Sequence, residues 1–518
     1  MPLRLDRLMT DACARFAATV ALDDGNRQIT YQELADGSER LRRALEAAGH
    51  RPGQAVLVAV SNRADDLVCQ LAAWRAGAVV VPVHRGSPAT VVGATAARTS
   101  AAFLLGAPAH HPTAWNSLAP EPATEAAETR ASLWVRALSG PPAQPSDGAP
   151  GTPPTELTSE QALVVFTSGS TGQPKGVVLS HEAFAGKLGA IQSVLPFGTG
   201  TRTAQVLQLN FSFAQWTALL TLLNGGTLRL VPRFSVDAAL AVLGAERADR
   251  IAMVPSMLRR LVRALDEPGP RAALAERSSP GLLIAGGEPL PAGLGRKVRT
   301  LLPHTEIADV YGLSETSTSD FILTPDAYDI GAGTIGSPSP GVSFRIAGPD
   351  GHECSSGQVG DLWIRTPYVM TGYLGDPAAT RDALTNGWLR TGDLARTRPG
   401  DGLVELSGRA KQLISRGGVK ISPLEIENCC AAHPACTECI AVGLPDPDLG
   451  ERIHLLVVQG TRPVPDRERL RAWCRERLEP YKLPDEVHAV AQLPVGRTGK
   501  ADRIAARHLA ATIAGIAV

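Results

Sequence analysis

The sequence predicts an α/β protein with a large N-terminal domain of parallel αβ sheets plus a β-rich subdomain, and a small α+β C-terminal domain. Apolar strands alternate with amphipathic helices as far as about Gly341, a pattern typical of parallel sheets. Beyond Gly341 short strands and turns replace the helices, and a new αβ pattern starts after "GRAKQLISRGG". Because 518 residues exceed what one hydrophobic core supports, we expect two to four domains. The change of pattern near Gly408 to Lys411 divides the chain into residues 1–408 and 409–518.

The first αβ unit is predicted between residues 31 and 83. The stretch "YQELADGSERLRRALEAAGH" carries Leu34, Leu41 and Leu45 at helical spacing. It is followed by the apolar strand "AVLVAV", the helix "RADDLVCQLAAWRAG" ending near Gly77, and a second strand, "AVVVPV". This β-α-β order predicts parallel strands joined by a right-handed crossover.

Composition and charge exclude several classes of function. Lys plus Arg and Asp plus Glu both number 51, so bulk charge predicts neither a nucleic-acid nor a membrane partner. The N-terminus is a poor signal peptide, because acidic residues interrupt its short apolar run. No apolar run reaches the length of a membrane span, so a cytoplasmic protein is expected.

The cysteine-rich stretch "CCAAHPACTEC" could be read as a zinc site formed by Cys430, His433, Cys436 and Cys439. However, "CTECIAV" is typical of a strand, whose alternation would direct Cys436 and Cys439 to opposite faces. We therefore expect reduced, partly buried thiols.

The stretch "VVFTSGSTGQPKGVVLSH" (residues 164–181) concentrates small hydrogen-bond donors in one loop. Its glycines let backbone N–H groups approach a ligand closely, and its hydroxyls and Lys175 add donors, which favours a phosphate chain. It is not a P-loop, because Gly176 follows Lys175 and the next residues, Val177-Val178-Leu179, indicate a strand. A flexible Ser/Gly surface turn is the alternative that this segment leaves open. The following helix is predicted to start after Ser180 and to bury Phe184, Leu188, Ile191 and Leu195.

Three further polar, glycine-containing stretches follow apolar strands: "AGGEPL" (285–290), "YGLSET" (311–316) and "GWLRTGDLA" (387–395). In open α/β sheets, ligand sites gather at the carboxyl ends of the strands. Glu315 could hold Mg²⁺ through its carboxylate, and Asp393 could accept hydrogen bonds from a ribose diol. Taken singly, each of these residues could equally be a turn or cap residue.

Together, five stretches resemble the adenylate-forming enzymes, which comprise acyl- and aryl-CoA synthetases, adenylation domains of peptide synthetases, and luciferases. The stretches are, in order, "TSGSTGQPKGV", "YGLSET", "RTGDLA", "GRAKQLISRGG" and "GRTGKADR". The resemblance runs from about Gly25 to Ala505. It implies a ligase that uses ATP and Mg²⁺ to convert a carboxylic acid into an acyl-AMP, with a mobile C-terminal domain.

The resemblance also implies roles for individual residues. The loop around the β- and γ-phosphates would comprise Thr167, Ser168, Gly169, Ser170, Thr171, Gly172 and Lys175. The adenine would lie against Gly286, Gly287, Glu288, Tyr311 and Gly312. Thr316 and Glu315 would contact phosphate and Mg²⁺, Asp393 would bind the ribose, and Arg409 would be a second contact to ribose or phosphate. Lys500 would bridge the carboxylate and the adenylate, and Lys411 would be the hinge of the C-terminal domain.

The acid pocket is the part that the resemblance specifies least. Ser212 stands where amino-acid-activating relatives carry an aspartate, so we expect a substrate without a free α-amino group. Aryl-acid relatives place Asn followed by an aromatic residue near this position, which Asn210-Phe211 fits, although the two alignments conflict. The other residues matched to the pocket are Phe213, Trp216, Leu283, Ala285, Val310, Thr318 and Ser319. A mostly apolar pocket with small hydroxyls suits an aryl, alicyclic or acyl acid.

The sequence leaves the acceptor open. Thiol ligases of this superfamily often carry a histidine in the stretch matching "LNFSFAQW", where this chain has none, and Asp361 replaces a commoner glutamate in "GDLWIR". The favoured acceptor is a thiol, either coenzyme A or a carrier protein acting in trans. The alternatives are an amine acceptor, in a stand-alone amide synthetase, and a catalytically inactive nucleotide-binding relative.

Overall fold

A computed structural model of the protein describes residues 3–106, 124–125, 134–137, 157–167, 174–244, 246, 248–267, 281–459, 463–496 and 500–516. Within these residues, none of the helices is long and apolar enough to cross a bilayer.

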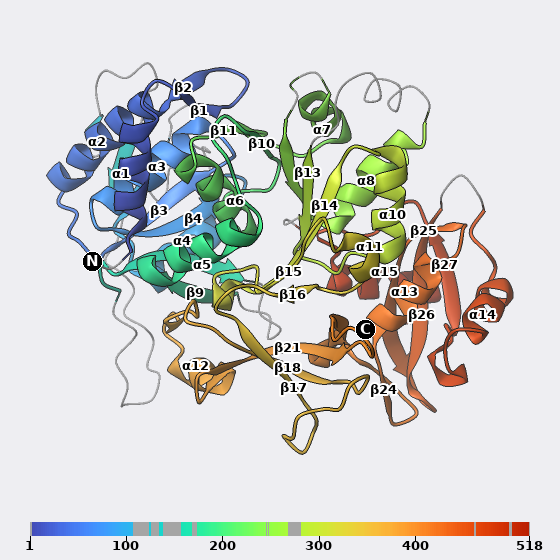
Figure 1. Ribbon diagram of the computed structural model, residues 1–518. Coiled ribbons are helices and arrows are strands. Elements are labelled where there is room, and N and C mark those ends of the chain that lie inside the picture. Colours follow the sequence, from blue (N-terminus) through green and yellow to red (C-terminus); the bar gives the residue numbers. More distant parts are fainter. Residues whose placement is uncertain are drawn as a thin grey trace.

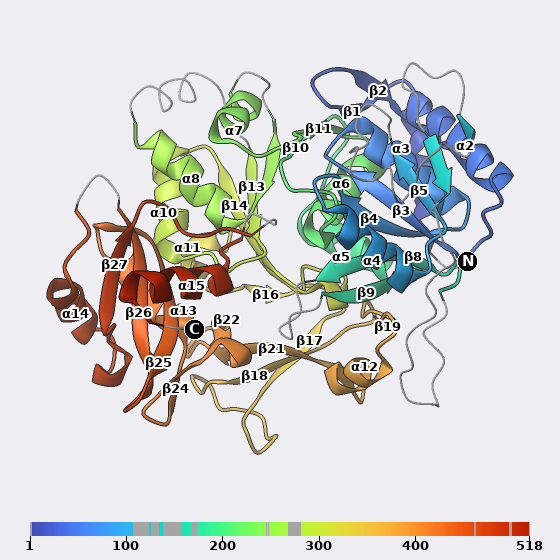
Figure 2. The same cartoon turned by 180° about the vertical axis from the view of Figure 1, so that it is seen from behind.

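Two large mixed sheets form the N-terminal part of the chain (Figures 1 and 2). In the described residues one sheet has eight strands, in spatial order β19 (Gly372–Tyr373), β9 (Lys175–Ser180), β8 (Gln161–Thr167), β4 (Val79–His84), β3 (Ala55–Val60), β5 (Phe103–Gly106), β7 (Trp134–Ala137) and β6 (Thr124–Glu125). The other has nine, in order β16 (Ser337–Pro338), β15 (Phe321–Leu323), β14 (Glu306–Tyr311), β13 (Leu282–Gly286), β12 (Arg250–Met253), β10 (Arg202–Gln205), β11 (Thr227–Leu230), β1 (Val20–Asp23) and β2 (Gln28–Thr30). Strands β3 and β4 are parallel, as are the neighbours from β12 to β14, which confirms the predicted α/β class.

Two smaller sheets follow in the sequence. The first comprises β17 (Ser343–Ala347), β18 (Gly360–Arg365), β20 (Leu384–Thr385), β21 (Trp388–Thr397) and β22 (Val404–Arg409), which is the predicted β-rich subdomain. The second comprises β23 (Ile414–Arg416), β24 (Val419–Ile421), β25 (Cys436–Asp446), β26 (Gly450–Gln459) and β27 (Glu486–Val490). The two smaller sheets are joined by a short connection between β22 and β23. It consists of the 3-10 turn η4 (Ala410–Gln412), which contains Lys411, and Leu413.

Helices pack on the faces of these sheets (Figure 1). In the N-terminal part they are α1 (Leu5–Arg15), α2 (Tyr31–Ala47), α3 (Ala64–Arg75), α4 (Ala89–Thr99), α5 (His181–Val194), α6 (Ser212–Leu223), α7 (Val236–Leu243), α8 (Pro255–Leu265), α10 (Ala292–Leu301), α11 (Tyr328–Gly331) and α12 (Pro377–Ala383). Those of the C-terminal part are α13 (Pro423–Ala431), α14 (Arg467–Arg475) and α15 (Arg503–Ala514). One apolar cluster includes Trp74 of α3, Phe184 of α5, Trp216 of α6 and Leu258 of α8, so the two large sheets share a core.

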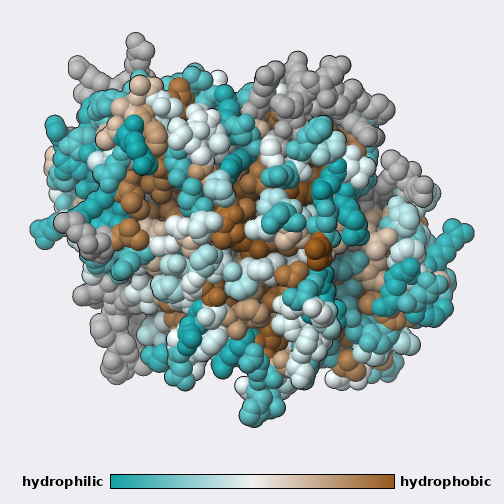
Figure 3. All heavy atoms as spheres, in the orientation of Figure 1, coloured by the Kyte–Doolittle hydropathy of each residue, from teal (hydrophilic) through white to brown (hydrophobic). Residues whose placement is uncertain are grey.

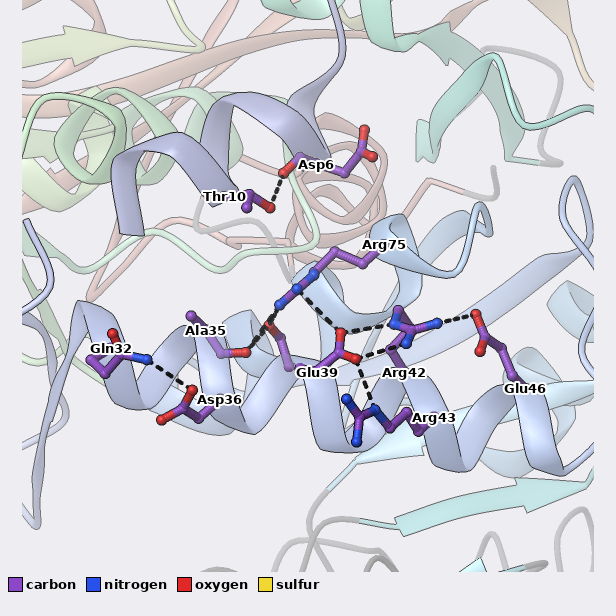
Figure 4. A network of polar contacts seen from close by, with 11 residues as sticks. Asp6, Thr10, Gln32, Ala35, Asp36, Glu39, Arg42, Arg43, Glu46 and Arg75 are labelled. Carbon is purple, nitrogen blue, oxygen red and sulfur yellow. Dashed lines mark hydrogen bonds and ion pairs between the residues drawn. The ribbon is translucent and has the colours of Figure 1, made fainter. Parts of the chain in front are cut away.

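The predicted helices have the expected buried faces. Leu34, Leu41 and Leu45 are at most 1% exposed on α2, and the Ser180 hydroxyl caps α5 by accepting from the Ala183 N–H. The polar face of α2 is held to α3 through Glu39 (Figure 4). The Glu39 carboxylate accepts hydrogen bonds from Arg42 and pairs with Arg75 of α3 at 3.2 Å. The Arg42 hydrogen bond is the main reason that the pKa of Glu39 is lowered to about 2.

Hydrophilic and apolar side chains occupy different parts of the face seen in Figure 1. Figure 3 shows hydrophilic side chains around the rim of the face seen in Figure 1, whereas apolar side chains are visible through its middle. In Figure 1 the middle of this face is where α6 and the strands β13 to β15 lie.

The positions of the cysteines differ in one detail from those predicted from the sequence. All eight are free thiols, and Cys429 and Cys430 end helix α13 while Cys436 begins β25, as predicted. However, Cys436 and Cys439 both pack against the same apolar cluster, so their expected placement on opposite faces is wrong. A β-bulge between Cys436 and Glu438 inserts one residue and interrupts the alternation.

The N-terminal segment is fastened to α5 by a buried histidine. The Leu5 N–H donates to Nδ1 of His181 at 3.2 Å, and the Arg4 guanidinium lies 3.5 Å from its Nε2. His181 is 1% exposed, and burial, followed by the nearby Arg4 charge, lowers its pKa from 6.5 to about 4. The folded protein therefore holds His181 neutral.

This buried imidazole predicts a loss of stability in acid. Between pH 6.5 and 4 the unfolded chain binds a proton that the folded chain does not, so stability falls as pH falls through this window. A shift of this size corresponds to about 3 kcal/mol at the acid end. Urea unfolding midpoints at pH 7.5, 6 and 5 measure it. His181→Gln, which keeps an acceptor for Leu5 but does not titrate, should flatten the part of the dependence due to this group. Equal acid sensitivity in both proteins would contradict the assignment.

Candidate active site

The carboxylate of Asp393 links three parts of the chain. Asp393 lies on β21, opposite Arg409 on β22, and its Oδ1 accepts from Arg409 Nε at 2.7 Å. Its Oδ2 accepts from the hydroxyl of Tyr311, at the end of β14, also at 2.7 Å. The Asp393 side chain is 5% exposed, whereas Arg409 is 55% exposed. Burial, and then the Asp393 charge, raises the pKa of Tyr311 well above its usual value, so this hydroxyl stays a donor.

The carboxyl ends of β13 and β14 lie side by side at this cluster, because Gly286 pairs with Val310 in the parallel register. A Cβ on Gly286 would lie 2.5 Å from Val310 Cγ2 and 2.8 Å from the Val310 carbonyl oxygen. A Cβ on Gly312 would collide with the backbone nitrogen of Ser319. Both glycines are therefore needed because neighbouring segments of the protein approach their backbone closely.

The C-terminal part brings Lys500 to the same edge. A Cβ on Gly287 would lie 3.1 Å from Lys500 Cε and 3.3 Å from its Nζ, so the lysine side chain passes directly over this glycine. The next residue, Ala501, donates its backbone N–H to Glu288 Oε1 at 2.8 Å. Burial lowers the pKa of Lys500, while the Glu288 and Asp393 charges oppose that shift. Predicted site residues from three distant segments thus meet here, namely Gly287 with Glu288, Asp393, and Lys500.

A second group lies at the base of the predicted phosphate loop. Thr167 and Lys175 are paired at the ends of β8 and β9. The other predicted loop residues, Ser168 to Gly172, lie outside the described residues. Lys175 Nζ lies 4.5 Å from the ring centre of Tyr373. The Tyr373 hydroxyl donates to Glu315 Oε1 at 2.9 Å.

The donor set around Glu315 is compatible with Mg²⁺. Mg²⁺ in nucleotide sites is commonly held by one or two carboxylates together with substrate phosphates and water. Glu315 supplies one carboxylate, with Oε1 engaged by a single hydroxyl. Among the described residues no cluster of three or more acidic, histidine or cysteine side chains offers a self-sufficient metal cage. The group would therefore hold the ion only in company with nucleotide phosphates.

Thr316 differs from its expected role. It is fully buried, and its hydroxyl donates to Asp320 Oδ2, so the hydroxyl is used within its own turn and not at the phosphate side. Lys187 of α5 completes the arrangement, with Nζ 2.9 Å from Asp320 Oδ1 and both side chains 0% exposed. This ion pair anchors the turn that follows Glu315.

The predicted acid-pocket residues fall into two groups. The residues of the first group lie close together, at the start of α6 and in the turn after β14. The Ser212 hydroxyl lies 3.0 Å from that of Ser314, and a Cβ on Gly286 would lie 3.2 Å from the Phe213 ring, on the side where Val310 lies. Thr318 and Ser319 occupy left-handed backbone positions with φ of 76° and 47°. The side-chain oxygens Oδ1 of Asn210 and Oγ of Ser319 are buried without a hydrogen-bond partner in the described structure.

Other predicted pocket residues lie elsewhere. Leu283 and Ala285 alternate with Gly286 along β13, so they point to the opposite face of the sheet from Phe213 and Val310. Trp216 is 0% exposed and stacks on Phe213 with ring centres 5.6 Å apart, so it supports Phe213 from the core. Phe211 precedes the first residue of α6 as its N-cap.

Three features of the site were not predicted from the sequence: Tyr373, Arg259 and the Lys187–Asp320 pair. Tyr373 reaches Glu315 because β19 pairs antiparallel with β9, a pairing between segments about two hundred residues apart. Arg259 lies 3.9 Å from Glu288 Oε2. Single aromatic or charged residues in such positions give no periodic signal that could have identified them.

Comparison with known proteins assigns the chain to a family. Residues 9–374 match the AMP-binding enzymes, and residues 425–500 match the C-terminal domain of AMP-binding enzymes, so the protein belongs to that family. It is an AMP-forming ligase of the adenylate-forming superfamily.

Three similar proteins illustrate the range of the family. Feruloyl-CoA synthase from an Amycolatopsis species is 32% identical over 93% of this chain and 94% of its own length. The fatty acid–acyl-carrier-protein ligase ScoC from Streptomyces coeruleorubidus is 29% identical over 92% and 90%. The solved structure of amide bond synthetase McbA from Marinactinospora thermotolerans is 27% identical, covers 98% of this chain and 99% of its own, and has a TM-score of 0.80.

The contact between Glu288 and Ala501 predicts a separable effect on the reaction. Glu288→Ala removes the acceptor that holds the Lys500 segment against β13, whereas Glu288→Gln retains an oxygen there. We expect Glu288→Ala to slow acyl-adenylate formation about tenfold, the effect of losing one hydrogen bond of about 1.5 kcal/mol. Glu288→Gln should stay within about threefold of the parent protein. Stopped-flow measurement of pyrophosphate release checks both variants; equal impairment would mean that charge, not docking of Lys500, is the role of Glu288.

Proposed function

We propose that this ligase activates a carboxylic acid without a free α-amino group as its acyl-AMP and transfers the acyl group to a thiol, either coenzyme A or a carrier protein. The observation that carries the proposal is the convergence of Lys500 with Gly287, Glu288 and the Asp393 cluster. These residues come from the middle and the C-terminal part of the chain, and they supply a cation and hydrogen-bonding groups where an adenylate would need them.

The chemistry follows from charge. The carboxylate of the acid attacks the α-phosphorus of ATP, and pyrophosphate leaves. Two anions must approach each other, so cationic and hydrogen-bonding groups that act at the developing charge lower the barrier. In the proposal Lys500 lies between the two reacting groups, and Lys175 and the donors of the loop at residues 168–172 hold the phosphates. Mg²⁺ held at Glu315 would add positive charge to the phosphates. Asp393 would accept hydrogen bonds from the ribose hydroxyls. Tyr311 and Arg409 already hold its carboxylate in position through hydrogen bonds.

The proposed domains are residues 1–408 and 409–518, with Lys411 in η4 as the hinge. Support comes from the sheets: β22 ends at Arg409, and the last sheet contains only strands after Lys411. In this orientation the C-terminal domain delivers Lys500, so it suits acyl-adenylate formation. Transfer to the acceptor would require the domain to turn and open the site.

The preference for an acid without an ammonium group rests on Ser212. In the structure its hydroxyl faces that of Ser314 at 3.0 Å, a neutral pair that offers no carboxylate to a buried ammonium group. The nearby acid, Asp320, is already paired with Lys187. The likeness to feruloyl-CoA synthase supports an aryl acid, and that to ScoC supports an acyl chain and a carrier-protein acceptor.

An amine acceptor is the second candidate. It is favoured by the likeness to the amide bond synthetase McbA and by the lack of a histidine in "LNFSFAQW". Assays of acyl-AMP consumption with coenzyme A, with a phosphopantetheinylated carrier protein and with simple amines distinguish the two.

Lys500→Ala should lower the rate of acyl-adenylate formation by about two to three orders of magnitude, the scale for losing one electrostatic donor to the transition state. Transfer from supplied acyl-AMP should be much less affected, because Lys500 acts before that step. The matched control is Lys297→Ala, since Lys297 pairs with Asp266 on the surface of α10. Equal loss in both half-reactions would contradict the role.

The acid preference is tested by competition in ATP–pyrophosphate exchange. We expect benzoate-like and medium-chain acyl acids to support exchange better than any α-amino acid, because the pocket offers an ammonium group no carboxylate. Ser212→Asp should raise exchange with α-amino acids relative to aryl acids. An α-amino acid that outcompetes both acid classes in the parent protein would show that the pocket is misassigned.

A further inference from the structure

A cleft of about 820 Å³ lies between the β-rich sheet and the C-terminal part, away from the site described above. Figures 1 and 2 both show β17, β18 and β21 beside β24 and α13 in this region. One wall consists of residues from β17, β18, β21 and β22 and from the connection between β17 and β18, and the other of residues that follow the proposed hinge, from Leu413 onward. Its volume is in the range of pockets that hold small organic ligands, roughly 300–1,000 Å³.

The charged residues of the cleft leave an excess of positive charge. Four cationic side chains and two carboxylates line it. Arg390 is paired with Asp361 at 2.7 Å, and Lys482 with Glu425 at 2.7 Å. The other two cations are Arg345 on the first wall and Lys420 on the second, and neither forms an ion pair with a carboxylate in the described part of the chain.

Arg345 is also held rigidly. Its guanidinium lies over Trp363 and Trp388, with 5.1 Å and 4.9 Å to the ring centres. Its Nε is buried and has no hydrogen-bond partner among the described atoms, and the same is true of the Ser422 hydroxyl on the opposite wall. Buried donors without partners are costly, so they mark positions where a ligand oxygen would be stabilised. An arginine fixed on aromatic faces loses little freedom on binding an anion.

We propose that this cleft is a binding site for a small phosphorylated molecule, whose phosphate lies between Arg345 and Lys420. Tyr481, which lines the second wall and is 39% exposed, offers an aromatic face for a planar group of the same molecule.

Occupancy of the cleft would bias the orientation of the C-terminal domain. This consequence rests on the proposed function, in which the domain turns about Lys411. A turn there separates the two walls, because Arg345 precedes the hinge and Lys420 follows it. A ligand that needs both walls binds one orientation only and stabilises it. At ten times its dissociation constant it would favour that orientation about elevenfold. The bound molecule would therefore hold the enzyme in the orientation for acyl-adenylate formation and delay transfer.

The first test is affinity labelling with pyridoxal 5′-phosphate. This compound is planar and carries a phosphate, and its aldehyde condenses with a lysine amine, releasing water, to give an imine that borohydride reduces to a stable amine. Peptide mapping then reports each lysine separately. With AMP and pyrophosphate saturating the nucleotide site, we expect labelling of Lys420 at least fivefold above that of Lys297, a surface lysine. Pyridoxal without the phosphate should label the two lysines equally.

The matched variants are Arg345→Gln and Arg365→Gln. Arg365 also lies over Trp388, at 5.0 Å, but it does not line the cleft. Arg345→Gln should reduce Lys420 labelling at least fivefold, and Arg365→Gln should leave it unchanged. Labelling that is insensitive to the phosphate or to Arg345→Gln would overturn the binding site. Near-ultraviolet circular dichroism of the unlabelled variants verifies that they are folded.

The second test is hydrogen–deuterium exchange with pyridoxine 5′-phosphate, which cannot form the imine. Protection of both residues 343–365 and 413–425 in the parent protein, and of neither in Arg345→Gln, would support the coupling to orientation. Protection of one wall alone would overturn it. Neither test requires a known acid, so failure of the proposed ligase activity would appear separately, as an absence of pyrophosphate release with every acid tested.

Discussion

The arrangement of the site depends on one buried carboxylate, that of Asp393. It accepts from Tyr311 at the end of the nine-stranded sheet and from Arg409 at the end of the β-rich sheet. Arg409 is also the last residue before the turn that contains Lys411. Because a buried carboxylate needs such partners, the hydrogen bonds fix the mutual position of the two sheets and the starting point of the C-terminal part. The proposed ribose site and the proposed hinge are therefore built from the same contacts.

The buried pair of Lys187 and Asp320 has a comparable role on the other side of the site. An ion pair that is fully buried adds little net stability, but breaking it is costly, so it enforces one local arrangement. Here it holds the turn after β14, in which Ser317, Thr318 and Ser319 all have positive φ. Gly312 packs against the backbone of that turn. This turn places Glu315 beside Tyr373, and hence beside Lys175 at the base of the phosphate loop.

The cleft and the active site are related through the same short connection. Both are formed by residues from before and after the junction at residues 409–413, so the proposed turn of the C-terminal domain about Lys411 would change both at once. The enzyme would then respond to two kinds of phosphorylated ligand. One is the nucleotide that it consumes, and the other is a molecule that is not consumed but stabilises one orientation of the C-terminal domain. Coupling of this type needs no change of shape within either domain, only a difference in affinity between two orientations.

The sequence by itself determined the α/β class, the strand and helix order, and the loops that carry Lys175, Glu315, Asp393 and Lys500, because hydrophobic periodicity and glycine-rich turns are local properties. Only the tertiary structure decided which side chains meet. The pairing of β19 with β9 brings Tyr373 to Glu315, and the β-bulge after Cys436 reverses an alternation that the sequence pattern had predicted. Likewise, strand register separates Leu283 and Ala285 from Val310, although all three precede glycine-containing site loops. Contacts between distant segments depend on register, bulges and packing, which leave no periodic trace in the sequence.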